Sequence, residues 1–482
     1  MTAAIQGIYG ILQYLDIFQS NNSYFKISGS FLNPGPFGGY LASALPISLG
    51  LFFDKIRKRG SESVKICIGR SSKEASSIYI YGVILTIQVI ALVLSESRSA
   101  WIAVIISIVV FCFIVSKSRK KEKIFYLYTG AFMLFTLLFG ARHLYEFKKD
   151  SADGRLFIWT VTSDIILDNP VFGVGFDGFK SHYMNAQKNR IRANSNSYVS
   201  NNIVDDVIYT FNEPLQFICE NGIVGGALLF LFILYSFPNR HIFNKQTTII
   251  AFCGCLSICI FSLFSYVSDS LPIILNLILY VSILGSNSRE VYSFCCIRGN
   301  LLNNLYMLIL FLVISIGSFK IFHFYQSVKA WNKANQIYML GDYNYSLIYY
   351  EKAYVSFMKN GDFMAMYGKS LLSSNKFEQA INILKKAEDL KNSSVVQCAL
   401  GDSFKALHNY NMAENAYLNA SSMVPGRLYP YYLLLKLYEE KNDEISALHM
   451  AEFILTKSIK VDSQAIDQML QEAKRIKSKF RT

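Results

Sequence analysis

Residues 77–116 read SIYIYGVILTIQVIALVLSESRSAWIAVIISIVVFCFIVS. Two apolar blocks, 77–95 and 100–116, flank a short polar turn that carries Arg98. Each block approaches the roughly 20 apolar residues that a helix needs to cross the hydrocarbon core of a bilayer. The stretch therefore predicts two membrane helices joined by a turn at a membrane surface.

Blocks of similar length recur along the first two thirds of the chain. Of the 482 residues, 52% are hydrophobic and only 17% are charged. We expect an all-α fold in which residues 1–324 form a polytopic helical membrane domain of about nine spans. The expected spans are 2–18, 36–53, 77–95, 100–116, 123–140, 214–237, 247–267, 271–284 and 305–322. The first of these lacks a charged start, so we expect it to be an internal span that earlier spans precede.

Basic loops alternate with the other loops along this domain. Lysine and arginine concentrate in loops 54–76, 117–123, 238–246 and 285–304. Few or balanced basic residues mark loops 19–35, 96–99, 141–213 and 268–270. Because basic loops stay on the cytoplasmic side, we expect the large loop 141–213 and everything after residue 324 on the outer face. These juxtamembrane clusters account for the net charge of +13, so the sequence predicts no nucleic-acid partner.

From Trp331 onward the sequence repeats with a period near 34. The recurring positions are aromatic at Tyr343, Phe377 and Tyr410, small at Ser346, Ala380, Ala413 and Ala447, and small again at Ala353, Ala387 and Ala420. This pattern resembles tetratricopeptide repeats over about 330–460. We expect residues 325–482 to form an α-solenoid with a concave groove for a protein partner. The alternative is a structural appendage without a partner.

The large loop contains several candidate functional residues. Residues 154–159 open an expected helix that runs to Leu167, and a glycine run follows at 172–179. No βαβ pattern flanks this run, so it predicts a tight turn rather than a dinucleotide site. His182 and Tyr183 follow on an expected short amphipathic helix. His182 is either a general base or a structural histidine.

Two further positions are unusual because they place charge at or within the membrane. Arg98 must face water, protein or an anion, or extend along the interface to reach water. Glu220 lies inside the expected span 214–237, where an acid is costly and is usually functional or paired.

Four segments together resemble the O-antigen ligase and O-antigen polymerase family of bacterial glycan transferases. They are residues 30–34 with 40–42, residues 97–101, residues 154–159 with 169–175, and residues 212–225. They occur in the family's order between about 20 and 285. The family often has a histidine where this chain has Phe211, and it has more spans than we count.

The resemblance implies a GT-C-like multi-pass protein of the bacterial inner membrane, with the large loop and the repeat domain in the periplasm. It implies transfer of a glycan from an undecaprenyl-pyrophosphate carrier to a hydroxyl of lipid A–core or of a glycoprotein, as in lipopolysaccharide biosynthesis. Its other expected partner is membrane lipid. Neither a metal nor another cofactor is expected.

Arginine suits such a reaction because a guanidinium pairs with phosphate oxygens and stays charged. Arg98 and Arg155 are therefore the expected clamp for the departing diphosphate. With Phe211 unable to act as a base, Glu213 is the first candidate, followed by His182 and by Asp205 or Asp206. The alternative is a reaction without a strong base, in which an oxocarbenium-like transition state makes the acceptor lose its proton late. The expected substrate contacts are Asn212, Tyr183, Asp206 and Glu220.

Three other interpretations stay open. A polymerase of the same family would extend the glycan on its lipid carrier. A catalytically decayed membrane-anchored scaffold would act through its repeats alone. A transporter would need paired discontinuous helices and charges near the midplane, of which the sequence offers few.

Overall fold

The computed structural model describes residues 1–62, 71–118, 145–146, 148–193, 203–236, 246–286, 300–459 and 463–480, with single positions between 124 and 135. The chain divides into two compact units, which are described separately. Unit 1 comprises residues 1–155 and 209–291, and unit 2 comprises residues 156–208 and 292–482. Every regular element within the described ranges is a helix, as the all-α prediction requires.

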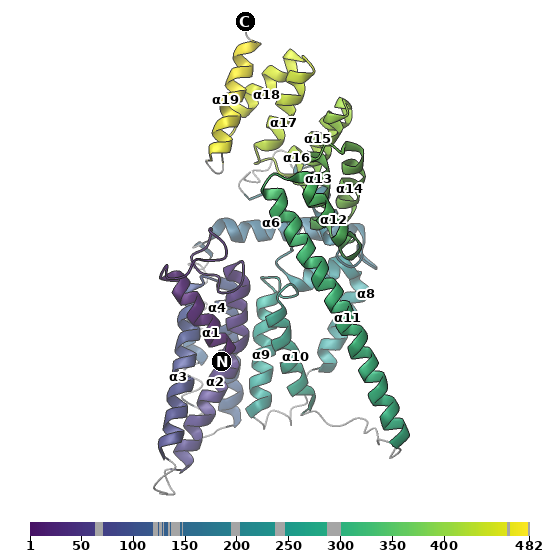
Figure 1. Cartoon of the computed structure of the whole chain (residues 1–482). Helices are drawn as coiled ribbons and strands as arrows, with labels where there is room; N and C mark the ends of the chain where they lie inside the picture. Colours follow the sequence, from purple (N-terminus) through teal and green to yellow (C-terminus); the bar gives the residue numbers. More distant parts are fainter. Residues whose placement is uncertain are drawn as a thin grey trace. The chain divides into compact units, whose positions relative to one another are not determined.

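Unit 1 consists of apolar helices, most of which pack into one bundle (Figure 1). Its helices are α1 (Thr2–Tyr14), α2 (Pro34–Glu62), α3 (Ser71–Leu94), α4 (Arg98–Ser118), α8 (Glu213–Ser236), α9 (Gln246–Ser262) and α10 (Leu271–Ser286). Helix α2 packs against α3, α4 and α9. Phe37, Leu41 and Leu45 recur on one face of α2 and are almost wholly buried. This apolar face positions the first half of the bundle.

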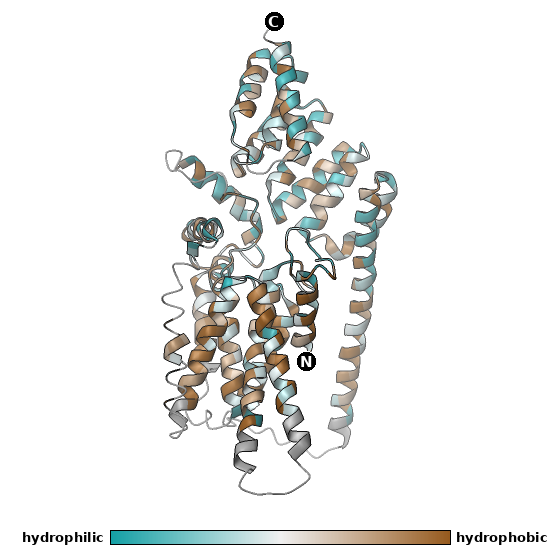
Figure 2. Cartoon of the chain, turned by 90° about the vertical axis from the view of Figure 1, so that its left-hand side faces the viewer, coloured by the Kyte–Doolittle hydropathy of each residue, from teal (hydrophilic) through white to brown (hydrophobic). Residues whose placement is uncertain are grey.

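Five helices are long and apolar enough to cross a membrane among the residues described. These segments are Pro34–Ile56, Ser77–Leu94, Arg98–Val115, Glu213–Leu234 and Asn304–Met339, and two shorter apolar helices are Gln246–Ser262 and Leu271–Ser286. They correspond to seven of the expected spans. The expected span 2–18 is a helix of 13 residues, and most of 123–140 lies outside the described residues. Figure 2 shows long helices that are predominantly hydrophobic, whereas the repeat helices alternate in hydropathy.

Helix α8 is broken in its middle. Gly222 has φ 67° and ψ −172°, which no helical residue adopts. Only glycine takes this conformation without strain. Among the glycines of segment 212–225, Gly222 is therefore required by the backbone conformation at its position.

Unit 2 contains the loop helices and the repeat array. Helix α6 (Lys149–Asp168) contributes its residues from 156 onward, and α7 (Phe179–Ala193) follows. Gly173 and Gly175 both have positive φ between these helices, which confirms the expected tight turn. The array consists of α11 (Asn300–Met339), α12 (Tyr343–Phe357), α13 (Gly361–Ser373), α14 (Phe377–Leu390), α15 (Ser394–Ala406), α16 (Tyr410–Met423), α17 (Tyr429–Glu440), α18 (Glu444–Thr456) and α19 (Gln464–Lys479).

The array is a solenoid of helix pairs, in which each helix packs against the next. The turns between paired helices repeat one local design. A left-handed residue occurs at each of them, and these residues are Gly341, Asn375, His408 and Asn442. The small positions of the sequence period are all fully buried: Ser346, Ala380, Ala413 and Ala447, then Ala353, Ala387 and Ala420. Small side chains at these positions allow the paired helices to approach closely.

The expected domain boundary at residue 324 lies inside a continuous helix. Helix α11 has 40 residues, so it is about 60 Å long and exceeds the thickness of a hydrocarbon core. Its C-terminal part supplies Ala334 to the buried core of the repeat array. By packing, residues 156–208 of the large loop also belong to the unit that contains the array. Packing thus divides the chain at other positions than hydropathy does, and the division into a membrane domain 1–324 and a repeat domain 325–482 stays a prediction.

Candidate functional site

Arg98 begins α4 directly after a tight turn. Ser95 Oγ donates to the carbonyl of Leu92 at 2.7 Å, and Trp101 Nε1 donates to the same carbonyl at 2.8 Å. Gly38 of α2 lies against this turn so closely that a Cβ there would be 2.6 Å from the Cβ of the turn residue Ser97. The turn is therefore fixed from both sides, and it holds Arg98 at the start of its helix.

Arg155 lies on α6 and contacts a different part of unit 1. Its Nη1 donates to the carbonyl of Phe264 at 2.8 Å, and its guanidinium carbon lies 5.3 Å from the ring centre of Phe211. Burial and, to a smaller extent, the charge of Arg98 lower the pKa of Arg155 to about 10. The side chain therefore remains cationic at neutral pH. In the part of the chain that is described, no carboxylate forms an ion pair with Arg155.

The structure thus brings the two expected arginines within electrostatic range of each other. The pKa of Arg155 is sensitive to the charge of Arg98, although 57 positions separate them in the sequence. Two like charges held close together repel each other and favour an anion between or beside them.

Glu213 holds the segment that follows α9. Its Oε1 accepts hydrogen bonds from Val267 N at 2.6 Å, Ser268 N at 2.9 Å and Ser268 Oγ at 2.8 Å. The carboxylate is thus oriented by three donors, all of which lie on Oε1. The other oxygen, Oε2, accepts no hydrogen bond from the residues described. Glu213 can consequently present one oriented oxygen that retains its lone pairs.

Segment 264–268 connects α9 to α10 and contacts both Arg155 and Glu213. Tyr266 stacks on Tyr209 with ring centroids 4.4 Å apart and meets the edge of Phe211 at 5.6 Å. Burial raises the pKa of Tyr266, Asp269 raises it further, and Arg155 opposes the rise. Neither this segment nor the two tyrosines were predicted from the sequence. Their aromatic rings were the available signal, but aromatics are common throughout this chain.

The remaining candidates in unit 1 have local partners. Asn212 caps α8, since its Oδ1 accepts from Leu215 N at 3.0 Å. Glu220 is 8% exposed and accepts from Gln216 Nε2 at 3.2 Å. Both contacts explain the residue types structurally, and their expected role in substrate binding stays a prediction.

Four candidates belong to unit 2, and one of them, Asp205, pairs with Arg427 at 2.6 Å. His182 is exposed, and its Nδ1 lies 2.9 Å from the carbonyl of Gly178. The same Nδ1 lies 2.9 Å from Ser181 Oγ, and a hydroxyl can donate or accept, so these contacts fit either tautomer of the ring. Tyr183 is fully buried, and the burial raises the pKa of its hydroxyl. Asp206 forms an ion pair with Arg427 at 2.5 Å. Tyr183 and Asp206 are thus engaged in packing and pairing within unit 2.

The repeat array also contains a cavity of about 290 Å³. Its lining includes Tyr338 of α11, Lys369 of α13, Asp402 of α15 and Tyr429 of α17. These residues come from the first helix of successive pairs. The cavity thus lies among the first helices of the pairs, and the expected groove and its partner stay predictions.

The described residues contain no group of three or more His, Cys, Asp or Glu side chains that could hold a metal ion. The polar groups found at the candidate site are two guanidiniums, one oriented carboxylate and aromatic hydroxyls. Such a set is chemically able to bind an anion and to accept a proton, and it does not exclude a metal supplied together with a substrate.

The long apolar helices define a helical membrane protein, and a comparison with family models narrows its class. Residues 82–231 match the family model described as O-Antigen ligase. This range includes Arg98, Arg155 and Glu213. The match supports glycan transfer of the O-antigen ligase or polymerase type, and hence a glycosyltransferase-like enzyme.

Two further comparisons add little. None of the curated proteins compared with the chain matches it. A solved structure titled "Crystal structure of MamA protein" is 18% identical and covers 32% of this chain and 86% of that chain, with a TM-score of 0.26. A TM-score this low carries no argument about the fold.

Proposed function

We propose that the protein transfers a glycan from an undecaprenyl-pyrophosphate carrier to an acceptor hydroxyl, in the manner of an O-antigen ligase. The reaction takes place on the periplasmic face of a bacterial inner membrane and needs no metal. The donor is carried by lipid, which suits a site at the outer ends of membrane helices. The acceptor is lipid A–core or a glycoprotein.

The setting of Arg155 is the observation that carries this proposal: its guanidinium bonds to the carbonyl of Phe264 and lies against the ring of Phe211, and the charge of Arg98 acts on it. As the glycosidic bond breaks, the diphosphate leaves with its bonding electron pair and gains negative charge. Two guanidiniums near that oxygen stabilise the charge more in the transition state than in the ground state. Among the described residues no carboxylate forms an ion pair with Arg155. The positive charge of Arg155 can therefore interact with the diphosphate of the substrate.

Glu213 is the proposed base for the acceptor hydroxyl. Three donors hold Oε1, so Oε2 points from a fixed carboxylate and can accept the proton. The proton transfer and the attack on the sugar carbon then complete the exchange. His182 is the second candidate. Asn212 and Glu220 are proposed substrate contacts on the first part of α8.

The test is glycan transfer in membranes that contain the full chain. Arg98→Ala and Arg155→Ala should each reduce transfer by about 100-fold. Arg98→Lys and Arg155→Lys should retain part of the activity, because lysine binds phosphate only as a point charge. Arg475→Ala is a matched control, since Arg475 pairs with Glu439 and Glu472 in the repeat array. Unchanged transfer in both alanine variants would remove the clamp from the mechanism.

A second measurement separates this function from its alternatives. A strain without the protein should accumulate long unattached chains if the protein is a ligase, and single-unit chains if it is a polymerase. Expression of the repeat array alone should not restore the phenotype. Restoration by the array alone would favour the decayed-scaffold interpretation.

A further inference from the structure

Loop helix α7 lies on the repeat array, within unit 2. It packs against α14 and α16, which are the second helices of two successive pairs. Three polar pairs accompany this packing: Asn185 with Asn392 at 3.3 Å, Lys188 with Asn419 at 3.3 Å, and Arg192 with Ser422 at 3.1 Å. The helices that line the cavity described above are the first helices of the pairs instead. Two other residues of the cavity lining, Ser394 and Arg427, bind the loop carboxylates Asp206 and Asp205, so the loop contact adjoins this cavity.

Gln187 is the buried centre of this contact. It is fully buried, and its Nε2 donates to the carbonyl of Met423 at 2.8 Å and to that of Asp205 at 3.1 Å. One side-chain amide thus joins α7, the end of the loop and the end of α16. A buried amide that bonds to backbone carbonyls fixes the register of a contact.

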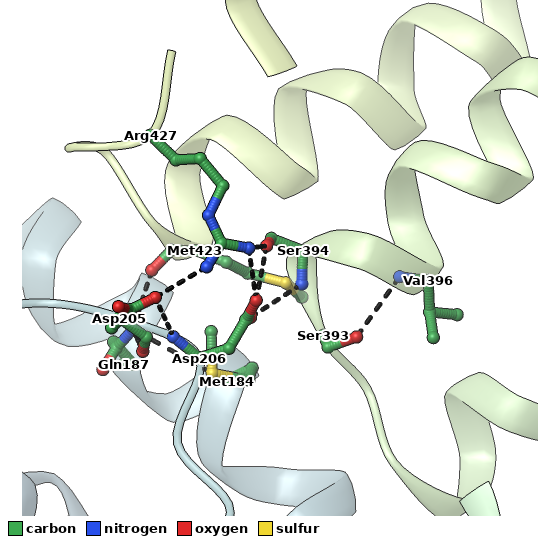
Figure 3. Close-up of polar contacts among 9 residues, drawn as sticks. All are labelled: Met184, Gln187, Asp205, Asp206, Ser393, Ser394, Val396, Met423 and Arg427. Atoms are coloured by element: carbon green, nitrogen blue, oxygen red, sulfur yellow. Dashed lines mark hydrogen bonds and ion pairs between the residues drawn. The ribbon is translucent and has the colours of Figure 1, made fainter. Parts of the chain in front are cut away.

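Arg427 of the repeat array adds two ion pairs to this contact (Figure 3). Its guanidinium pairs with Asp205 at 2.6 Å and with Asp206 at 2.5 Å. Asp206 also accepts from Ser394 N at 3.0 Å and Ser394 Oγ at 2.8 Å, at the start of α15. A carboxylate is favourable at that position because backbone N–H groups and the helix dipole point toward it. Burial alone would lower the pKa of Arg427, but Asp206 and Asp205 raise it above its usual value.

The same loop helix is tied to α6. Arg190 of α7 pairs with Asp164 of α6 at 2.5 Å. Helix α6 runs without interruption from Lys149 to Asp168 and also carries Arg155. A helix transmits displacement along its axis, because each turn is hydrogen-bonded to the next.

We propose that the repeat array has the chain's own loop as its partner, and that Arg427 is a positioning residue that holds α7 and loop residues Asp205 and Asp206 for glycan transfer. The effect on transfer rests on the proposed function. The loop contact itself does not, and it is measured independently. In this proposal the array stabilises the position of the loop that contains Arg155, and it is not a structural appendage without a partner.

The test uses the full-length protein in lipid nanodiscs and follows hydrogen exchange of the α7 amides. In Arg427→Asp these amides should exchange at least about tenfold faster, because two ion pairs are replaced by like charges. Arg427→Lys should give an intermediate rate. Asp206→Asn changes only the loop side and should also accelerate exchange, which keeps the test valid if Arg427→Asp unfolds the array. Arg475→Asp is the matched control and should leave the α7 rates unchanged.

Glycan transfer by the same variants gives the second result. Slower transfer in proportion to faster α7 exchange supports the positioning role. Unchanged α7 exchange in both Arg427→Asp and Asp206→Asn overturns the proposal. Faster exchange with undiminished transfer refutes the positioning role of Arg427. If the unmodified protein transfers no glycan, the proposed function fails while the exchange data still decide whether the loop is held.

Discussion

Arg155 makes several contacts, none of which is with a carboxylate among the described residues. One nitrogen donates to a backbone carbonyl, one aromatic ring lies against the cation, and a second arginine lies nearby. None of these contacts neutralises the charge. This environment differs from that of Arg427, whose two carboxylates pair with it fully. The contrast supports assigning Arg155 to a substrate anion and Arg427 to structure.

The ring of Phe211 should matter for Arg155 even though it cannot act as a base. Phe211→Leu removes the cation–π contact and the edge contact with Tyr266, so we expect transfer to fall by about 3–30-fold, which corresponds to about 0.5–2 kcal/mol. Phe211→Tyr keeps the ring and should retain most of the activity. The measurement is the transfer rate at saturating donor. Equal rates for the wild type and Phe211→Leu would show that the ring does not support Arg155.

The hydroxyl of Tyr183 provides a test of a residue predicted to bind substrate. It is buried and has no hydrogen-bond partner among the described residues. Tyr183→Phe should therefore keep transfer unchanged and stabilise the protein by about 1 kcal/mol, because a desolvated polar group is removed. Thermal unfolding and the transfer rate check this expectation.

Tyr417→Phe is the matched comparison for that experiment. Tyr417 is also fully buried, but its hydroxyl donates to Asp402 at 2.6 Å. Its removal should lower the melting temperature, because Asp402 loses its partner. A marked loss of transfer in Tyr183→Phe, with normal folding, would restore Tyr183 as a substrate contact.

Among the helices, the approach of α2 to the turn before α4 sets the position of Arg98. Gly38→Ala would place a Cβ 2.6 Å from Ser97 Cβ, so the turn has to move. We expect a loss of about 1–3 kcal/mol in stability together with reduced transfer. Gly317→Ala in α11 is the control, since a Cβ added there would meet nothing within 4 Å among the described residues. If both variants behave like the wild type, the turn does not depend on this close approach.

The periodic elements were predictable from sequence and the convergent contacts were not. The small positions such as Ala380 and Ala413 are selected by a packing requirement that recurs every repeat, so their spacing appears directly in the sequence. At the candidate site, backbone carbonyl and amide groups of segment 264–268 bond to Arg155 and Glu213. Every residue type has these backbone groups, so the sequence does not indicate such contacts. Arg427 and Asp206 are 221 positions apart, and no local pattern relates them.

Over the full chain, the packing units do not follow the division expected from hydropathy. Leu156–Ile208 belong by packing with the array, while Met1–Arg155 and Tyr209–Val291 belong with the apolar bundle. Hydropathy reports the solvent around a segment, whereas packing reports its neighbours in the protein. A segment in the loop between membrane helices can therefore be part of the repeat unit.

The proposed mechanism depends on two guanidiniums that hold the departing lipid diphosphate. The affinity of the purified full-length protein for undecaprenyl pyrophosphate, titrated in nanodiscs at fixed salt, tests this dependence without requiring the acceptor. We expect Arg98→Ala and Arg155→Ala each to weaken binding by at least about tenfold, as for the loss of a charge-assisted contact, while Arg475→Ala binds like the wild type. Wild-type affinity in both site variants would contradict the mechanism.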